Sequence, residues 1–379
     1  MLPATKTHRF SLADVLPSCL ESVLGRSGSL GLPAVDKAVV ILVDGMGARA
    51  LADRAGHART LAPLLNRGST IGAGFPTTTA AALATFTTGT QPGEHGLVGY
   101  TALDTANNRV INQLSGGDGR LDPASWQRMP TVFERAGSES IPSFVIATEK
   151  HRRSWFTKAV LRGAEYRGAE GIPERMAAAR EILDGANRAI VYVYIAELDK
   201  VGHSHGCESP EWTGQLEEVD AAVRGFAASL RSREGLLVTA DHGVLDIPEH
   251  SHVLFGEDAA LVDGVRFVAG EPRCLQLHLQ PDASPELRAT ALETWREAEG
   301  GRSWVVSRDE AIAAGWFGPT VAPEVAPRIG DIIIAARKNI AYYDTRSPNN
   351  SGRSMVGQHG SLSAAETAIP LLGFGAYAR

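Results

Sequence analysis

The stretch AVVILVDGMG, residues 38–47, places an unbroken apolar and mostly β-branched run directly before an aspartate and two glycines. A short apolar run that ends in a turn signal is typical of a strand buried on both faces of a parallel sheet. Three further runs have the same character: SFVIAT (143–148), AIVYVYI (189–195) and GLLVTA (235–240). The sequence therefore predicts a central, mostly parallel sheet.

Helical stretches separate these runs, among them PERMAAAREILDG (173–185) and WTGQLEEVDAAVRGFAASLRSR (212–233). Strands that alternate with helices indicate an α/β layered fold, in which helices flank the sheet. The pattern changes between residues 246 and 335, where VRFVAGEPRCLQLHL reads as extended segments, SPELRATALETWREAEG as an amphipathic helix and GDIIIAARKNIAYYD as a further strand pair.

We expect from this change a core made of residues 1–245 and 336–379. Residues 246–335 would form a smaller α+β subdomain inserted into that core. The chain returns to the core at GQHGSLSAAETAIPLLGFG.

Composition narrows the class of protein. The chain has 379 residues, 44% hydrophobic and 21% charged, with a net charge of −6, which argues against a nucleic-acid polymer as partner. Its three cysteines, Cys19, Cys207 and Cys274, lie far apart and suggest no disulfide framework. Neither a signal-like apolar core nor a bilayer-length apolar run occurs in the sequence. We expect a cytoplasmic protein without a membrane partner, and no feature of the sequence specifies an oligomeric state.

Polar side chains follow the predicted strands where each strand ends. Asp44 follows the first run, Asp241 and His242 follow GLLVTA, and Asp199 and His203 follow AIVYVYI. The carboxyl ends of parallel strands meet at one edge of a sheet, where ligands bind in open α/β folds. Asp199 and His203 are four residues apart, which places them on one face of a helical turn. Gly243 predicts that the chain leaves the sheet there, so that Asp241 and His242 point the same way.

A further histidine, His359, lies in the glycine-flanked sequence GQHGS. With Asp199 and His203 it completes one Asp/His/His set, and Asp44, Asp241 and His242 form a second set with a position open for a hydroxyl. Aspartate and histidine are ligands that zinc prefers, although manganese and iron accept them too. An aspartate after a strand more often caps a helix or forms a turn, but the combination favours two divalent metal ions. Two such ions a few ångströms apart can clamp the oxygens of a displacement at phosphorus.

Three threonines in a row, Thr77, Thr78 and Thr79, precede an alanine-rich stretch in PTTTAAALATF. Threonine at the start of a helix commonly caps the first free N–H groups. The same place is the positive end of the helix dipole, which attracts phosphate. We expect Thr77 and Thr78 to cap and pack.

The motifs along the chain are, in order, Asp44, a Pro-Thr-x-Thr turn followed by TG and HG, then LDKVGHSHG, TADHG and a final HG. This order of motifs resembles that of the alkaline phosphatase superfamily. Its branch of type I phosphodiesterases and nucleotide pyrophosphatases is the most similar. The resemblance runs from Asp44 to His359. It implies an alkaline-phosphatase-like fold, and it implies that the six Asp and His residues named above hold two ions, in this family usually zinc. It also implies that Thr79, at the end of the turn, is the nucleophile, coordinates the ion of Asp44, Asp241 and His242, and forms a covalent phospho-threonine.

The resemblance further implies a small phosphorylated substrate, with a phosphodiester or a nucleotide pyrophosphate bond as the one hydrolysed. Two positions differ from nucleotide-hydrolysing members: Ala80 replaces an aromatic residue that stacks on the base, and Tyr100 replaces a phosphate-binding asparagine. Tyr100 can donate one hydrogen bond in its place. The alternatives are a phosphomonoesterase or phosphonate hydrolase of the same superfamily, or a non-catalytic metal-binding relative. The basic stretch EKHRRSWFTK (149–158) is either an anion-attracting surface or an ordinary solvated one.

Overall fold

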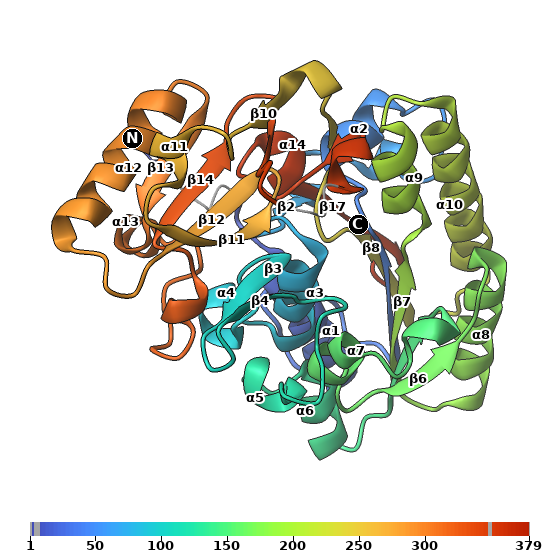
Figure 1. The fold of residues 1–379 in the computed structure, drawn as a ribbon. Coiled ribbons are helices and arrows are strands. Elements are labelled where there is room, and N and C mark those ends of the chain that lie inside the picture. The colour runs from blue at the N-terminus through green and yellow to red at the C-terminus, as the bar shows by residue number, and fades with distance from the viewer. Residues whose placement is uncertain (1, 4–7, 348–350, 379) are drawn as a thin grey trace.

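Two β-sheets organise the chain in the computed structural model, which describes residues 2–3, 8–347 and 351–378 (Figure 1). Within these residues the larger sheet has 7 strands in the order β2-β17-β8-β1-β7-β5-β6. The strands from β8 to β6 run parallel, whereas β17 is antiparallel to both β8 and β2. The strand bounds are β1 Lys37–Val43, β2 Thr70–Gly72, β5 Ser143–Ala147, β6 Glu165–Gly168, β7 Ala189–Ile195, β8 Glu234–Thr239 and β17 Ala368–Gly375. The predicted mostly parallel sheet is confirmed, and its expected strands end within one residue of the predicted positions.

The apolar runs are buried because helices cover both faces of this sheet. All residues of β1 after Lys37 are buried, as is the whole of β8. Helices α1, α3 and α6 pack on one face and α8, α9 and α10 on the other (Figure 1). These helices are α1 Val15–Val23, α3 Thr79–Thr88, α6 Val132–Ser138, α8 Ile172–Gly185, α9 Glu197–His205 and α10 Pro210–Ala228. Helix α10 ends five residues before the predicted position 233, where the Ser229 hydroxyl donates to the Phe226 carbonyl and the chain turns.

The smaller sheet has 6 strands in the order β13-β14-β12-β11-β3-β4 and is antiparallel. Its strands are β3 Thr101–Asp104, β4 Arg109–Asn112, β11 Val265–Glu271, β12 Cys274–Leu279, β13 Ser303–Ser307 and β14 Ile332–Ala336. Helix α12, Pro285–Glu299, packs against β13 and buries Trp295 completely. Strands β3 and β4 come from residues 101–112, so this sheet draws on the chain both inside and outside the segment 246–335.

The expected strand pair in GDIIIAARKNIAYYD forms two strands that do not pair with each other. Strand β14 lies between β12 and β13, and β15 (Ala341–Tyr343) pairs in parallel with β10 (His252–Leu254). All residues of β14 are apolar and buried, which suits a central position with a neighbour on each side.

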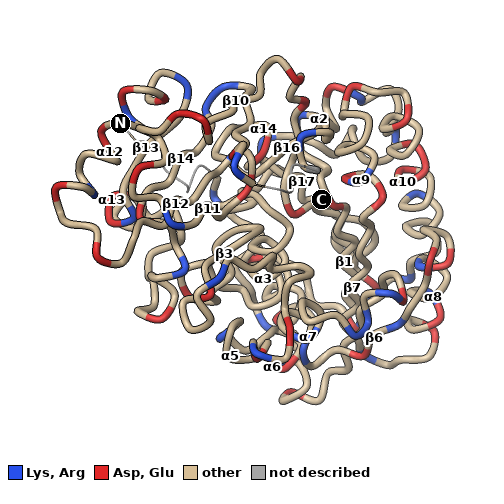
Figure 2. The backbone as a smooth tube through the Cα atoms, viewed as in Figure 1, with Lys and Arg blue, Asp and Glu red and all other residues tan. Residues whose placement is uncertain are grey.

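The remaining short elements are α2 Ala48–Asp53, α4 Pro92–His95, α5 Pro123–Trp126, α7 Trp155–Val160, α11 Ala259–Val262, α13 Arg308–Ala313, α14 Ala364–Thr367, β9 Leu245–Asp246 and β16 Gly357–Gln358. Charges of both signs occur along the outer helices α8 and α12, whereas the charged residues of α10 are mainly acidic (Figure 2). In the described ranges we find no helix with the length and apolar character required to cross a bilayer.

A buried ion pair ties the smaller sheet to the C-terminal loop of the larger one. Arg273, in the β11–β12 turn, donates to both carboxylate oxygens of Glu366 at 2.8 and 2.9 Å, and neither side chain is exposed. Glu366 in turn accepts from the backbone N–H of Ser361 at 2.9 Å. The loop 357–361 is thereby held against the carboxyl ends of β1, β7 and β8, where the polar residues predicted from the sequence lie.

Candidate metal centre and nucleophile

Asp44, Asp241 and His242 form a buried group at the carboxyl ends of β1 and β8. One ligand atom of each lies within 4.8 Å of the others. His242 Nε2 is 3.4 Å from Asp44 Oδ1 and 3.5 Å from Asp241 Oδ2. All three side chains are at most 3% exposed, so water cannot solvate them freely.

The turn after β8 brings Asp241 and His242 to the same side. Strand β8 ends at Thr239, and a bend follows at residue 241. A Cβ atom on Gly243 would lie 2.0 Å from the Ala365 carbonyl oxygen, so only glycine allows this close approach. The predicted departure from the sheet at Gly243 is confirmed.

Each carboxylate of this group has one oxygen bonded and one left over. Asp241 Oδ1 accepts from the N–H groups of Gly45 at 3.1 Å and His242 at 3.0 Å. Asp44 Oδ2 accepts from the Tyr194 hydroxyl. The other two oxygens, Asp44 Oδ1 and Asp241 Oδ2, are buried with no hydrogen-bond partner. A buried carboxylate oxygen without a partner is costly, and a cation would satisfy both.

The pKa shifts of these three residues also favour a bound cation. Burial, and then the charges of Asp241 and Asp199, raise the pKa of Asp44 well above its ordinary value. Burial, and then Asp199, raise the pKa of Asp241 to about 7. Burial holds the pKa of His242 well below its ordinary value, so its imidazole is neutral and able to act as a ligand. Two carboxyl groups thus lie side by side, and among the described residues neither forms an ion pair with a lysine or an arginine.

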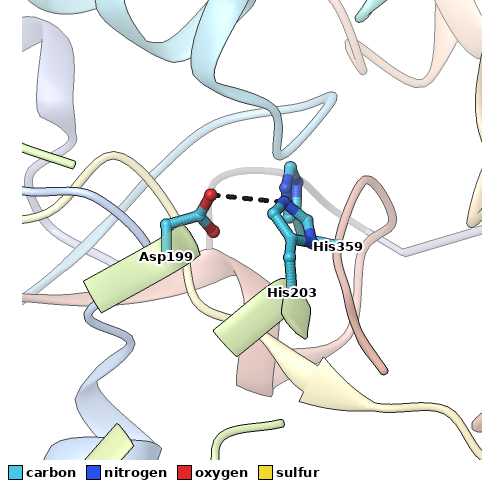
Figure 3. A group of neighbouring side chains, drawn as sticks. All are labelled: Asp199, His203 and His359. Carbon is cyan, nitrogen blue, oxygen red and sulfur yellow. Dashed lines mark ion pairs between the residues drawn. The ribbon is translucent and has the colours of Figure 1, made fainter. Parts of the chain in front are cut away.

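A second group joins Asp199 and His203 of α9 to His359 of the loop 357–361, and the three side chains point toward one another (Figure 3). His203 Nε2 is 3.2 Å from Asp199 Oδ2, as the four-residue spacing predicts. His203 Nδ1 is 2.8 Å from the Gly357 carbonyl, and His359 Nδ1 is 2.7 Å from the Thr77 carbonyl. A carbonyl accepts only, so each Nδ1 donates. The Nε2 atoms are the remaining ring nitrogens for a metal, and that of His203 faces Asp199, another member of the same group.

The pKa shifts in the second group arise from its own ion pair. Burial would raise the pKa of Asp199, but the hydrogen bond and charge of His203 lower it below the ordinary value. Burial would lower the pKa of His203, but the hydrogen bond and charge of Asp199 raise it. Burial lowers the pKa of His359. Asp199 is therefore ionised near neutral pH.

The two groups are neighbours. The rings of His242 and His359 stack with their centroids 3.8 Å apart. Gly45 separates Asp44 from Asp199: at φ +72°, a Cβ atom on it would lie 2.9 Å from Asp199 Oδ1. The structure thus brings the six predicted ligand residues together in the two sets expected, and their binding of metal stays a prediction.

Thr79 is the first residue of α3, and its Oγ1 lies 3.2 Å from His242 Nε2. The side chain is 9% exposed, the most accessible of the three threonines.

The predicted capping role of Thr77 and Thr78 is wrong. Thr78 occupies the N-cap position without a side-chain capping bond. The Thr77 hydroxyl instead donates to the Ser361 carbonyl at 2.8 Å and accepts from the Gly360 N–H at 3.0 Å, because the loop of His359 lies against it.

The uncapped start of α3 has a chemical consequence. Because no side chain accepts from the first-turn N–H groups, they stay available to an anion next to Thr79. A phosphoryl group attacked by Thr79 would lie at the positive end of this helix.

Tyr100, Ala80 and the stretch 149–158 differ in their exposure to solvent. Tyr100 is 39% exposed, and its N–H donates to Glu271 Oε2 at 2.7 Å. Ala80 is fully buried. In the basic stretch 149–158, Arg152 is engaged by Glu149, whereas Lys150 and His151 are exposed. Strand β5, which precedes this stretch, pairs in parallel with β7, which precedes α9.

Sequence reasoning missed the residues that support the ligands. Tyr194 donates to Asp44, and the carbonyls of Thr77 and Gly357 orient two histidines. Carbonyl partners leave no trace in a sequence. Tyr194 leaves a weak one: it is one of two tyrosines at alternate positions in AIVYVYI, which places both hydroxyls on one face of the strand.

Comparison with known proteins gives one family. The family model described as type I phosphodiesterase / nucleotide pyrophosphatase matches residues 38–362. A curated relative, ectonucleotide pyrophosphatase/phosphodiesterase 1 of Saccharomyces cerevisiae, is 25% identical over 224 residues. That match covers 48% of this chain but only 29% of the yeast protein.

Solved structures share the fold at low sequence identity. Murine ectonucleotide pyrophosphatase / phosphodiesterase 5, in an inactive form in complex with AMP, has a TM-score of 0.67 at 16% identity and covers 90% of this chain and 88% of its own. Phosphonoacetate hydrolase from Sinorhizobium meliloti, in complex with phosphonoacetate, has a TM-score of 0.66 at 17% identity. The match covers 90% of this chain and 91% of the hydrolase chain. The predicted alkaline-phosphatase-like layered fold is confirmed by these likenesses.

Proposed function

The chain belongs to the type I phosphodiesterase / nucleotide pyrophosphatase family, and from that premise we propose that it is a two-metal hydrolase of phosphodiester or nucleotide pyrophosphate bonds. The observation that carries this proposal is the position of Thr79: its hydroxyl lies 3.2 Å from a nitrogen of the Asp44, Asp241 and His242 group, at the start of an uncapped helix. A nucleophile, a cation site and phosphate donors are thus together in one place.

The donor sets fit two divalent cations. Asp44 Oδ1, Asp241 Oδ2 and Asp199 Oδ1 are buried and lack hydrogen-bond partners. Mixed carboxylate and imidazole donors favour zinc, with manganese and iron as chemically acceptable alternatives. When bound, such cations lower the pKa of a nearby hydroxyl and offset the charge that develops on phosphoryl oxygens.

Thr79 is the residue that reacts. Its Oγ1, having lost its proton, bonds to phosphorus while the bond to the leaving alkoxide or phosphate breaks, and a covalent phospho-threonine results. Water then adds to that phosphorus, the Thr79 oxygen leaves, and the hydroxyl is regenerated. Over both steps one ester or anhydride bond and one water are consumed, and the proton that Thr79 loses is restored when its hydroxyl is regenerated. The free N–H groups of the first turn of α3 hold the phosphoryl oxygens.

Substrate recognition involves residues outside the two metal groups. Tyr100 is exposed and offers one hydroxyl donor for a phosphate oxygen. Lys150 and Lys200 both lie near enough to His151 to lower its pKa, after burial as the main cause. Within the described ranges neither lysine has an ion-pair partner, which supports a substrate with negative charge.

Two solved neighbours represent the chemical alternatives, because one was solved with AMP and the other with phosphonoacetate. The test is a comparison of rates on a phosphomonoester, a phosphodiester, a dinucleotide and a phosphonate, with the zinc content measured on the same sample. We expect the phosphodiester or the dinucleotide to be hydrolysed fastest. A faster phosphomonoester or phosphonate would assign that activity instead, and no activity with two metals bound would identify a non-catalytic relative.

A further inference from the structure

Tyr194 lies next to the first metal group, in contact with its ligand residue Asp44. It is the last residue but one of β7 and is paired in register with Leu42 of β1, two residues before Asp44. Its hydroxyl donates to Asp44 Oδ2. Tyr192 lies on the same face of β7, two residues earlier, with the two ring centroids 6.4 Å apart.

The two oxygens of Asp44 have different environments. Oδ2 is engaged by Tyr194, whereas Oδ1 is buried without a hydrogen-bond partner and faces His242 Nε2 at 3.4 Å. Asp241 shows the same division, with Oδ1 on two backbone N–H groups and Oδ2 free. Each carboxylate therefore presents one oxygen to the space they share. In Asp241, backbone N–H groups determine which oxygen is left over, and in Asp44 the hydroxyl of Tyr194 determines it.

We propose that Tyr194 is a positioning residue for the first metal site. By occupying Oδ2, it holds Asp44 in the orientation that directs Oδ1 at a cation shared with Asp241 and His242, and so raises the affinity of that site. Groups that hold a metal ligand in this way typically account for about 10–100-fold in affinity. The inference deepens the proposed function, because it requires that the site bind a cation.

Tyr192 provides a matched control. Its side chain is 1% exposed, and its hydroxyl has no hydrogen-bond partner among the described residues. Tyr192→Phe therefore removes a buried hydroxyl from the same strand and the same face, without touching Asp44. Tyr194→Phe removes the one hydroxyl that does.

The experiment measures zinc binding to metal-free protein by competition with a chromophoric chelator, for the wild type, Tyr194→Phe and Tyr192→Phe. Asp44→Asn shows which of the two binding steps belongs to this site. We expect Tyr194→Phe to weaken that step about 10–100-fold, to leave the other step unchanged, and to alter the visible spectrum of the cobalt-substituted protein. Tyr192→Phe should match the wild type, and circular dichroism should show that both variants fold.

Equal zinc affinities in Tyr194→Phe and the wild type would overturn the inference alone. An equal loss in both tyrosine variants would also overturn it, because it would show a packing effect. A wild type that binds none of zinc, manganese and iron would overturn the proposed function itself, together with this inference.

Discussion

His242 and His359 stack face to face, with 3.8 Å between ring centroids and 19° between ring planes. Each belongs to a different metal group, and they are separated by more than a hundred residues of sequence. The contact fixes the spacing of the two groups, because neither ring can move without displacing the other. The geometry of one candidate metal group is therefore coupled to that of the other.

Replacing Thr79 by alanine should abolish turnover, because its hydroxyl oxygen is the proposed nucleophile. We expect the rate on a chromogenic phosphodiester to fall by roughly a thousandfold or more, with two metals still bound. Thr78→Ala is the control, since its side chain is buried and makes no capping bond. Full activity in Thr79→Ala would remove Thr79 from the mechanism.

Replacing His359 by alanine should weaken one metal site and spare the other. His359 supplies one of three donors to the group of Asp199 and His203. Elemental analysis after dialysis should show the loss of about one equivalent of zinc. His57→Ala is the control, because His57 is exposed and pairs with Glu217. An unchanged zinc content would contradict the ligand set.

Zinc should stabilise the protein more as the pH rises. Without a cation, burial raises the pKa of Asp241 from 3.8 to about 7, so the folded metal-free protein holds a proton that the unfolded chain releases. The stability due to this proton is present below about pH 4 and is lost as the pH rises toward 7. Zinc needs the ionised carboxylate, and therefore gains affinity over the same range.

Thermal unfolding with and without zinc, between pH 5 and pH 8, tests this. The rise in Tm caused by zinc should grow with pH in the wild type. In Asp241→Asn it should be smaller and should depend less on pH, because Asp44, whose pKa is also raised, still has to ionise. A wild-type rise that is the same at both ends of the range would contradict the assigned role of Asp241.

Breaking the pair of Arg273 and Glu366 should be costly, because both side chains are fully buried. Arg273→Ala leaves the Glu366 charge uncompensated, and we expect the free energy of unfolding to fall by about 3–5 kcal/mol. The comparison is Arg233→Ala, which breaks an exposed pair with Asp36 and should cost much less, because water solvates both charges when the pair is broken. Urea titration of both variants measures the difference, and equal losses would show that burial does not matter here.

Lys150 and Lys200 should matter only for substrates that carry charge beyond the reacting phosphorus. Replacing both by alanine should raise KM for a dinucleotide about 2–5-fold per lysine, as expected for loss of exposed ion pairs. KM for a phosphodiester with neutral substituents should change little. The difference between the two substrates should shrink at high salt. Lys158→Ala, an exposed lysine on α7, is the control.

Strand ends and helical spacing could be read from the sequence because they depend on local patterns. The apolar run before Asp44 predicts a buried parallel strand, and the polar residue after it must then lie at the carboxyl edge. The separation of Asp199 and His203 predicts a shared helical face. In both cases chain geometry over a few residues determines the outcome, and the structure has them as predicted.

Features that depend on distant contacts could not be read in this way. The pairing of residues 101–112 with the smaller sheet requires β11, more than 150 residues later. Thr77 does not cap its own helix, because its hydroxyl donates to the carbonyl of Ser361, which is 284 positions later in the sequence. Short-range propensity favoured a cap, and a tertiary contact replaced it.

The place of β17 between β2 and β8 affects how the protein is made. Of the named strands, β17 leaves the ribosome last, and the loop that carries His359 only shortly before it. Until then β8 has an unpaired edge, and Asp199 and His203 lack their third partner. A nascent chain halted before residue 357 would expose an unpaired strand edge and lack the third residue of the second candidate metal group, and an unpaired edge favours aggregation until β17 has been made.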